Sequence, residues 1–320
     1  MGVLNIGDGN DTISGSLAYE RFGNNNGYNL INLDTLNTGE GNDLIESSYG
    51  SGGYAVYSGI YNPGTLNTGE GNDTITAYGT DSGFINEAGT VNTGEGNDII
   101  TASGGYSSSS YGLGMSIWDG GTINTGNGED SIIISEGGFT NYGGVFLGES
   151  NDSLIASSAL ENYNAIETGD GNDIITSYNV IYNQGIINTG NGEDYIIVDA
   201  SAYEAPYGIH NNGGAINMGD GNDSIIANEG FESGPNSSGA WFLGEGEDYI
   251  KGYGSGDFYG GNGLDTLELT PGTYTVGIWD RVTFSKGNSL MLASEFEQLI
   301  AGDQTYDFTS LTAGQIIVVA

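Results

Sequence analysis

The chain contains no cysteine, and it has only four lysines and arginines against 42 aspartates and glutamates in 320 residues. The absence of cysteine excludes disulfide bonds and cysteine-based zinc or redox sites. The formal net charge of −38 makes nucleic acid and anionic membranes poor partners, because like charges repel. No lysine or arginine lies between Arg21 and Lys251, so the carboxylates of that region have no cationic side chain to neutralise them.

The chain also lacks long apolar runs and an N-terminal secretory signal, and it has a single histidine. No apolar run reaches the length of about 18 residues that a membrane-spanning helix needs, so no transmembrane segment is expected. The first residues, Met1–Asn5, lack the basic region and apolar core of a secretory signal, so an export signal would have to lie elsewhere. The single histidine, His210, is expected to be a loop residue, because a zinc site needs further histidines or cysteines.

A short glycine turn that ends in aspartate recurs eleven times, as in Gly39-Glu40-Gly41-Asn42-Asp43. The second position is acidic in eight copies. Where it is Asn127 or Asn191, the fourth position is Glu129 or Glu193, so ten of the eleven turns keep at least two carboxylates. Turn formation alone accounts for the glycines and asparagines. It does not account for an aspartate in every copy together with the missing cations.

Successive motif aspartates are 17 to 32 residues apart, a period typical of solenoids. Two apolar ladders keep the same register with the motif in all eleven copies. One lies two residues after the aspartate: Ile13, Ile45, Ile75, Ile100, Ile132, Leu154, Ile175, Ile196, Ile225, Ile250 and Leu267. The other lies three residues before the first glycine: Leu4, Leu36, Leu66, Val91, Ile123, Val145, Ile166, Ile187, Ile216, Trp241 and Phe258.

Each unit therefore predicts a strand, a tight glycine turn and a second strand, with the two ladders facing a shared core. A third recurring segment, as in residues 59–62, 83–86 and 208–211, indicates a further strand in the longer coils. Gly/Ser/Tyr-rich stretches such as Gly104–Ser110 are expected to be surface loops. The predicted fold is all-β, a right-handed parallel β-solenoid of about eleven coils over residues 1–268, with a small β-rich cap over residues 269–320.

Stacking these turns would bring equivalent carboxylates about 4.8 Å apart, and each such pair would cost about 4 kcal/mol at an intermediate dielectric. A hard divalent cation with oxygen ligands relieves that repulsion, and Ca²⁺ accepts six to eight oxygens from carboxylates and main-chain carbonyls. We therefore expect about ten Ca²⁺ ions between the coils and folding coupled to their binding. The predicted metal ligands are Asp11, Asp43, Asp73, Asp98, Asp130, Asp152, Asp173, Asp194, Asp223, Asp248 and Asp265.

The pattern Gly-x-Gly-x-Asp-x-aliphatic over residues 7–267 resembles the nonapeptide of the RTX (repeats-in-toxin, hemolysin-type) proteins. The resemblance implies a parallel β-roll in which the motif aspartates donate side-chain oxygens to calcium and the motif glycines donate carbonyl oxygens. This chain departs from the family because its units are not tandem nonapeptides, which implies one calcium row in place of two. Ser150 replaces the second motif glycine in one copy, and that site is expected to be the weakest.

From Thr270 onward the motif stops and polarity alternates, ending in the apolar segment Ile316–Ala320. This region resembles the C-terminal part of RTX exoproteins, which caps the solenoid and carries an uncleaved signal for type I secretion. A simple capping sheet is the alternative. The resemblance implies a secreted, extracellular protein with a possible cell-surface or polysaccharide-matrix partner.

We therefore predict a secreted, non-catalytic calcium-binding module with a structural or surface role. One alternative is a calcium-dependent ice-binding protein, for which the asparagine at motif position four suits an ordered array but the acidic side chain at position two does not. A less favoured alternative is an enzyme or module acting on polysaccharides, in which sugars would stack on Tyr111, Trp118, Tyr207 and Trp241. Acid–base catalysis on an acidic polymer usually needs lysine, arginine or histidine, which this chain nearly lacks.

Overall fold

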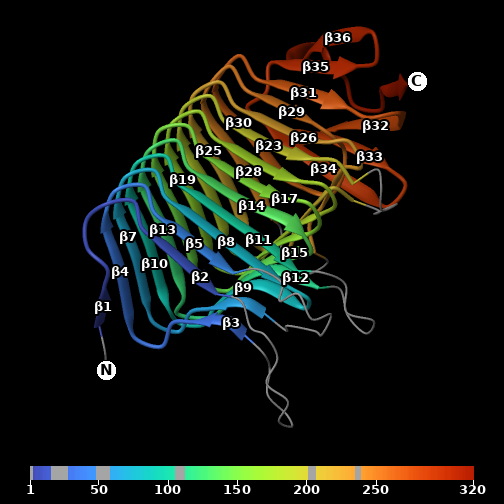
Figure 1. Ribbon diagram of the computed structural model, residues 1–320. Coiled ribbons are helices and arrows are strands. Elements are labelled where there is room, and N and C mark those ends of the chain that lie inside the picture. Colours follow the sequence, from blue (N-terminus) through green and yellow to red (C-terminus); the bar gives the residue numbers. More distant parts are fainter. Residues whose placement is uncertain (1–2, 16–27, 48–57, 105–111, 201–206, 235–238) are drawn as a thin grey trace. The chain divides into compact units, whose positions relative to one another are not determined.

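The computed structural model describes residues 3–15, 28–47, 58–104, 112–200, 207–234 and 239–320. It divides into two compact units, Met1–Gly169 and Asp170–Ala320. In each of them, short strands are stacked one beside the next (Figure 1). The boundary expected after residue 268 falls inside the second unit and stays a prediction. Both units are built almost entirely of short strands, which confirms the all-β class.

The first unit consists of three parallel sheets in which each strand pairs with its equivalent in the next coil. The first sheet holds the strands that enter the glycine turns: β1 (Val3–Asn5), β4 (Thr35–Glu40), β7 (Thr65–Glu70), β10 (Thr90–Glu95), β13 (Thr122–Asn127), β16 (Gly144–Glu149) and β19 (Ala165–Asp170). The second holds the strands that leave them: β2 (Thr12–Gly15), β5 (Leu44–Ser47), β8 (Thr74–Gly79), β11 (Ile99–Gly104), β14 (Ser131–Glu136) and β17 (Ser153–Ala156). The third contains β3 (Tyr28–Ile31), β6 (Ser58–Tyr61), β9 (Ser82–Asn86), β12 (Leu113–Ile117), β15 (Gly138–Asn141) and β18 (Leu160–Asn162).

The second unit repeats this arrangement. Its entering strands are β22 (Ile186–Asn191), β25 (Ala215–Asp220), β28 (Ala240–Gly246) and β30 (Gly256–Gly263). Its leaving strands are β20 (Ile174–Ser177), β23 (Tyr195–Val198), β26 (Ser224–Ala227), β29 (Tyr249–Lys251) and β31 (Thr266–Leu269). The third sheet of this unit contains β21 (Ile181–Asn183), β24 (Ile209–Asn211) and β27 (Phe231–Glu232).

The third strand is present in short coils as well as long ones, for example in β18 and β21. It is thus a regular side of the coil, where the sequence predicted it only for the longer coils. Equivalent residues pair along the strands that enter the turns: Thr65 pairs with both Thr35 and Thr90, and Asn67 pairs with Asn37 and Asn92. Of the predicted surface loop Gly104–Ser110, residues 105–110 lie outside the described residues.

The expected cap is present and antiparallel. β32 (Gly272–Ile278) pairs with β33 (Val282–Lys286) and β37 (Ile316–Val319), and β35 (Gln298–Ala301) pairs with β36 (Gln304–Asp307). β34 (Ser289–Ser294) and β35 also extend the two turn-flanking sheets by parallel pairing with β30 and β31. Within the cap, β34 and β35 therefore add the two turn-flanking strands of a twelfth coil, after the antiparallel hairpin β32–β33. A short 3₁₀ turn, η1 (Phe308–Ser310), connects β36 to β37.

The two apolar ladders form the core of each unit. Every member from Leu36 to Leu267 is buried, at 6% exposure or less. Leu4 is 59% exposed, because β1 is the edge strand of its sheet and has a neighbour on one side only. Within the described ranges, no helix is long and apolar enough to cross a lipid bilayer.

A ladder of asparagines is also buried, at the end of the third strand of most coils. Asn32 Nδ2 donates to Asn62 Oδ1 at 2.7 Å, and Asn62 Nδ2 donates to Asn86 Oδ1 at 2.9 Å. The same bond joins Asn141 to Asn162, and Asn183 to Asn211. Asparagine fits here because its amide carries both a donor and an acceptor, so one side chain bonds both neighbours along the stack.

Candidate metal centre in the glycine turns

The glycines of the motif are required by backbone geometry. Gly39 and Gly41 have φ angles of +117° and +127°, a region that residues with a Cβ rarely adopt. A Cβ at Gly69 would also overlap the carbonyl oxygen of Gly39 in the neighbouring coil, and one at Gly71 would overlap that of Gly41. The carbonyl oxygens of the motif glycines therefore point along the stack, toward the next turn.

Each motif aspartate uses one carboxylate oxygen to join two coils. The main-chain N–H of Asp43 donates to Oδ1 of Asp73, and that of Asp73 donates to Oδ1 of Asp98. Within each unit these bonds measure 2.7 to 3.0 Å, and they also involve Asp11, Asp130, Asp152, Asp173, Asp194, Asp223, Asp248 and Asp265. The row of aspartates is a structural element of the turn as well as a candidate ligand set.

The asparagine at motif position four makes a second row of bonds that sequence reasoning did not assign. Asn42 N–H donates to Asn10 Oδ1 at 2.9 Å, and Asn72 N–H donates to Asn42 Oδ1 at 2.8 Å. Where glutamate takes this position, its N–H still donates to the asparagine of the preceding coil, as from Glu129 to Asn97. The recurrence of asparagine beside the aspartate was the available signal, because its amide oxygen accepts a main-chain N–H in turns.

In nine of the eleven motif aspartates the second carboxylate oxygen has no such bond. The carboxylates are buried, at 2% exposure or less from Asp43 to Asp265, while Asp11 in the first turn is partly exposed. Oδ2 is inaccessible to solvent and without a hydrogen-bond partner in Asp11, Asp43, Asp73, Asp98, Asp130, Asp194, Asp223, Asp248 and Asp265. An unsatisfied buried carboxylate oxygen is costly, and its repetition down a row indicates a missing positive partner.

A nearby threonine hydroxyl does not fill this role. In several coils the residue before the first glycine is threonine. Burial raises the pKa of Asp73, and the nearby Thr68 hydroxyl acts in the opposite direction without cancelling that effect. However, Thr68 Oγ1 donates to the carbonyl of Thr93 at 3.0 Å. A hydroxyl has a single proton, so the aspartate oxygen is left without a donor.

Burial raises the pKa of these carboxyls, as expected for a charge removed from water. The pKa is about 6 for Asp98, Asp130, Asp194, Asp248 and Asp265, and about 7 for Asp223. After desolvation, the charges of neighbouring aspartates contribute, for example Asp130 and Asp73 acting on Asp98. The row therefore carries the charge repulsion that the sequence predicts.

The acidic side chain at motif position two does not lie beside the motif aspartate as a further ligand. Glu40, Glu70, Glu95 and the other position-two side chains are exposed on the outer side of the turn. Among the residues that the structure describes, no three acidic or histidine side chains converge as a metal cluster. The count of two carboxylates per turn therefore does not translate into paired ligands, because the position-two side chain is exposed while the aspartate of the same turn is buried.

The donor set that remains is one buried aspartate oxygen per coil together with main-chain carbonyls of the glycine turns. This set fits a hard cation that accepts carbonyl oxygens, such as Ca²⁺. It does not fit zinc, which prefers nitrogen and sulfur ligands in tetrahedral sites. Basic side chains do not compete in the described part of the chain: Lys251 pairs with Glu268, Arg281 with Asp257, and Lys286 donates to the carbonyl of Pro271.

Comparison with known proteins leaves the function open. No protein-family model matches the chain, and no curated protein matches it. Among solved structures, it is similar to a hyperactive, Ca²⁺-dependent, β-helical antifreeze protein from an Antarctic bacterium. The TM-score is 0.47 at 19% identity, over 83% of this chain and 71% of the other. At this level of similarity the functional argument has to rest on the residues of this chain.

The row has one further member that the sequence motif does not contain. The main-chain N–H of Asp265, in the eleventh turn, donates to Oε2 of Glu297 at 2.8 Å. Glu297 precedes β35, so it takes the position that the motif aspartate holds in the other coils. Because the glycine pattern is absent around Glu297, the motif could not identify it. The row of carboxylates that accept a main-chain N–H therefore extends one residue beyond Asp265, the last motif aspartate.

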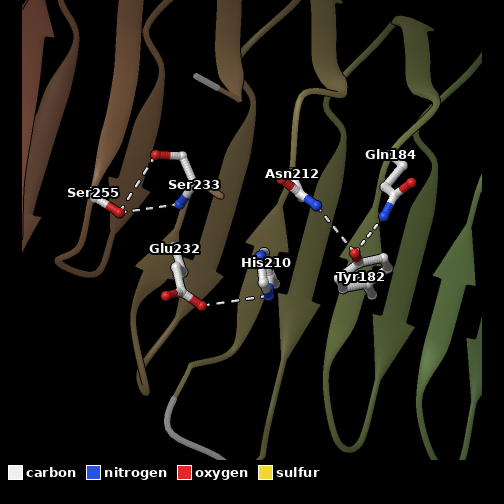
Figure 2. Close-up of polar contacts among 7 residues, drawn as sticks. All are labelled: Tyr182, Gln184, His210, Asn212, Glu232, Ser233 and Ser255. Atoms are coloured by element: carbon white, nitrogen blue, oxygen red, sulfur yellow. Dashed lines mark hydrogen bonds and ion pairs between the residues drawn. The ribbon is translucent and has the colours of Figure 1, made fainter. Parts of the chain in front are cut away.

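The single histidine, His210, lies outside the glycine turns. His210 is in strand β24, where a loop was expected, and its Nδ1 lies 3.4 Å from Glu232 (Figure 2). Tyr182 of the adjacent strand β21 contacts the His210 ring edge-on and accepts hydrogen bonds from Gln184 and Asn212. These are contacts between equivalent positions of stacked strands, and they account for the polar side chains on this face.

Of the four aromatic residues proposed to stack on sugars, one is not at the surface. Trp241 is fully buried and stacks on Phe258 with ring centroids 4.3 Å apart, so it belongs to the core, as its place in the apolar ladder predicts, and is not available to stack on a sugar. Trp118 is 52% exposed, and Tyr207 is half-buried. Tyr111 lies outside the described residues.

Proposed function

We propose that the chain is a secreted, non-catalytic β-solenoid that folds on binding a row of Ca²⁺ ions in its glycine turns and serves as an extracellular structural or surface module. The observation that carries the proposal is the buried aspartate row, in which Oδ1 is bonded to the next coil and Oδ2 is without a donor. A cation beside each Oδ2 would satisfy that oxygen and screen the repulsion between neighbouring aspartates. The proposed ligands are the eleven motif aspartates and carbonyls of the motif glycines.

Coupling to folding follows from the same geometry. Without cations, closing each turn buries an ionised or protonated carboxylate that lacks a partner, which opposes folding. With cations, binding free energy becomes folding free energy, because the unfolded chain does not present stacked turns. A protein of this kind would stay unfolded at low calcium and fold at the higher calcium concentration outside cells, which supports the extracellular assignment. The expected type I secretion signal in residues 269–320 is part of this proposal.

The test is a calcium titration followed by far-ultraviolet circular dichroism, with reversal by chelator. We expect a cooperative gain of β structure on adding calcium and its loss on removing calcium. Magnesium at the same concentration should substitute poorly, because it demands tight octahedral geometry and releases its water reluctantly. A chain that is equally folded in chelator, with an unchanged unfolding midpoint, would refute the proposal.

A second candidate, ice binding, is favoured by an array on the outer face of the first unit. Thr35, Thr65, Thr90 and Thr122 are in register along one line, and Asn37, Asn67, Asn92 and Asn124 along the next. The asparagines are bonded to one another: Asn92 donates to Asn67 at 2.8 Å and Asn67 to Asn37 at 2.7 Å. These bonds hold the amides at the strand spacing of about 4.8 Å.

A rigid, uncharged and regularly spaced array is what contact with an ordered water lattice requires, and the acidic turns do not offer it. Thermal hysteresis of the calcium-loaded protein tests this candidate. Measurable hysteresis that falls sharply when Thr65 and Thr90 are replaced by lysine would support ice binding by this face. Hysteresis near zero would exclude it and leave the structural or surface role.

A further inference from the structure

The cap presents a tryptophan to solvent at the tip of its first hairpin. Trp279 is the first of three residues that connect β32 to β33, and it is 85% exposed. The other two tryptophans are less exposed, Trp118 at 52% and Trp241 in the core. Single exposed apolar side chains are common on protein surfaces, so the role of Trp279 depends on what surrounds it.

Trp279 borders a hollow of about 430 Å³ on the outer face of the cap sheet. This volume lies within the range of small-ligand sites, about 300–1,000 Å³. The alternate residues of the same strands, such as Phe284 and Met291, are buried on the opposite face. Two rows of paired residues from β32, β33 and β34 line the hollow: Thr275, Ser285 and Leu290, and beside them Gly277, Thr283 and Leu292.

Glycine at position 277 lets two side chains lie over β32. A Cβ at Gly277 would be 2.4 Å from Oγ1 of Thr283 and 3.4 Å from Nε1 of Trp279. The threonine hydroxyl and the nitrogen-bearing edge of the indole therefore lie near each other at one end of the hollow. Most of the indole remains in solvent. An aromatic surface and a hydroxyl group are thus held together on one side of the sheet.

Apolar and hydroxyl groups alternate across the floor of the hollow. Leu290, which is 44% exposed, pairs with Ser285, and Leu292 pairs with Thr283. The Ser285 hydroxyl donates to the carbonyl of Thr275 at 3.3 Å, so its oxygen can still accept a hydrogen bond. A sugar ring has the same alternation, because its C–H groups form apolar faces and its rim carries hydroxyls. A purely apolar ligand would cover the protein hydroxyls without bonding them.

The charges around the hollow favour an uncharged sugar. Asp280 is the one charged side chain among the described residues that line it. The adjacent Arg281 is paired with Asp257 at 2.8 Å and lies 3.7 Å from Asp280, so its charge is already neutralised. An acidic sugar would meet the Asp280 carboxylate on a chain whose net charge is −38. A neutral sugar avoids this repulsion, and its hydroxyls can donate to that carboxylate.

We propose that this hollow is a carbohydrate-binding site, in which the Trp279 indole stacks on a sugar ring of an uncharged polysaccharide while Thr283 and Asp280 bond its hydroxyls. The proposal rests on the proposed function in one respect, since it names the partner of the extracellular module. The site lies within the cap and uses none of the eleven motif aspartates, so sugar binding and calcium binding are separate properties.

The test is affinity electrophoresis of the whole, calcium-loaded protein in gels that contain dextran, laminarin or hydroxyethyl cellulose, with carboxymethyl dextran as the anionic counterpart. Trp279→Ala removes the aromatic surface, and Trp118→Ala, at an exposed tryptophan of the first unit, is the matched control. Thr283→Val keeps the shape of the side chain and removes its hydroxyl. Circular dichroism checks that the variants keep their β structure, and sedimentation velocity gives their oligomeric state.

We expect at least one of the three neutral polysaccharides to retard the protein. Binding should be about tenfold weaker in Trp279→Ala, because an aromatic anchor contributes much of the binding free energy. It should be about threefold weaker in Thr283→Val, which loses one hydrogen bond, and unchanged in Trp118→Ala.

The absence of retardation by all three neutral polysaccharides would refute the site, as would equal losses in the two tryptophan variants. Retardation by carboxymethyl dextran alone would contradict the charge argument and overturn the proposal. A dimer that becomes a monomer in Trp279→Ala would assign the hollow to a second copy of the chain and also overturn it. Sugar binding without any calcium-dependent gain of β structure would uphold the site and refute the proposed function, whereas the reverse result would refute the site alone.

Discussion

The main-chain N–H of Asp98 donates a hydrogen bond of 2.7 Å to Oδ1 of Asp130, while Oδ2 of Asp130 is buried without a partner. The two oxygens of one carboxylate thus have separate roles. Oδ1 sets the register between coils, and Oδ2 is the oxygen that we assign to a cation. Substitutions that keep the hydrogen bond to Oδ1 but remove the charged oxygen Oδ2 should separate folding from metal binding.

Asp130→Asn is such a substitution, because the amide oxygen can still accept the Asp98 N–H. In metal-free protein we expect it to stabilise the fold by about 1–2 kcal/mol, since it removes a buried charge whose pKa is raised to about 6. In saturating calcium it should destabilise the fold, because an amide group replaces a charged ligand. Urea unfolding under both conditions measures the two effects.

Glu129→Gln is the matched control, since it removes one charge from the adjacent, exposed residue. It should change stability by less than about 0.5 kcal/mol under either condition. Equal effects of the two variants in calcium would show that the buried carboxylate is not a ligand.

The pH dependence of stability should reverse on adding calcium. Burial raises the pKa of Asp98 to about 6 and of Asp223 to about 7, above the ordinary value of about 3.9 in an unfolded chain. Between these values the folded, metal-free protein binds more protons than the unfolded chain, so its stability rises as the pH falls from about 7.5 toward 4. In saturating calcium, protons compete with the ion, and stability should fall over the same range. Denaturant unfolding at about pH 5 and pH 7.5, with metal-free and loaded protein, measures both slopes; parallel slopes would contradict a carboxylate–calcium row.

Ser150 stands where the other turns have their second glycine, and its φ angle is +95°. Because a residue with a Cβ is strained there, we expect Ser150→Gly to stabilise the calcium-loaded protein by about 1 kcal/mol or less, the gain being reduced by the greater freedom of glycine in the unfolded chain. Ser153→Gly, in the extended strand β17, is the control and should be destabilising. Thermal unfolding of both variants decides; a loss of stability in Ser150→Gly would mean that the serine hydroxyl has a role that the strain argument omits.

The buried asparagine ladder should contribute more to stability than the exposed one. Asn62→Ala leaves the amides of Asn32 and Asn86 each without one partner in the core, which should cost about 1–3 kcal/mol. Asn67→Ala breaks the equivalent bonds on the outer face, where water replaces them, and should cost less than about 1 kcal/mol. Chemical denaturation in calcium compares the two, and equal costs would contradict this account.

Much of the architecture was predictable because it depends on periodicity. The aliphatic residue two positions after each aspartate and the apolar residue three positions before each turn define the strands, and from Leu36 to Leu267 both ladders are buried as predicted. The candidate metal ligands were predictable for the same reason: one aspartate per turn, without cations nearby, is a pattern along the chain. That every one of them shares a bond with the next coil was not visible, since hydrogen bonds between coils depend on the stacking register.

What the amino-acid sequence determined by itself is the repeating coil, the acidic turn and the absence of neutralising side chains. Only the tertiary structure decided which carboxylates are buried, because two acidic residues of the same turn, such as Glu95 and Asp98, face solvent and core respectively. It also brought Glu297 to the end of the aspartate row from beyond the last repeat, across a hairpin that has no motif. The local sequence pattern specifies each coil, whereas the position of Glu297 beside the last coil depends on how the cap packs.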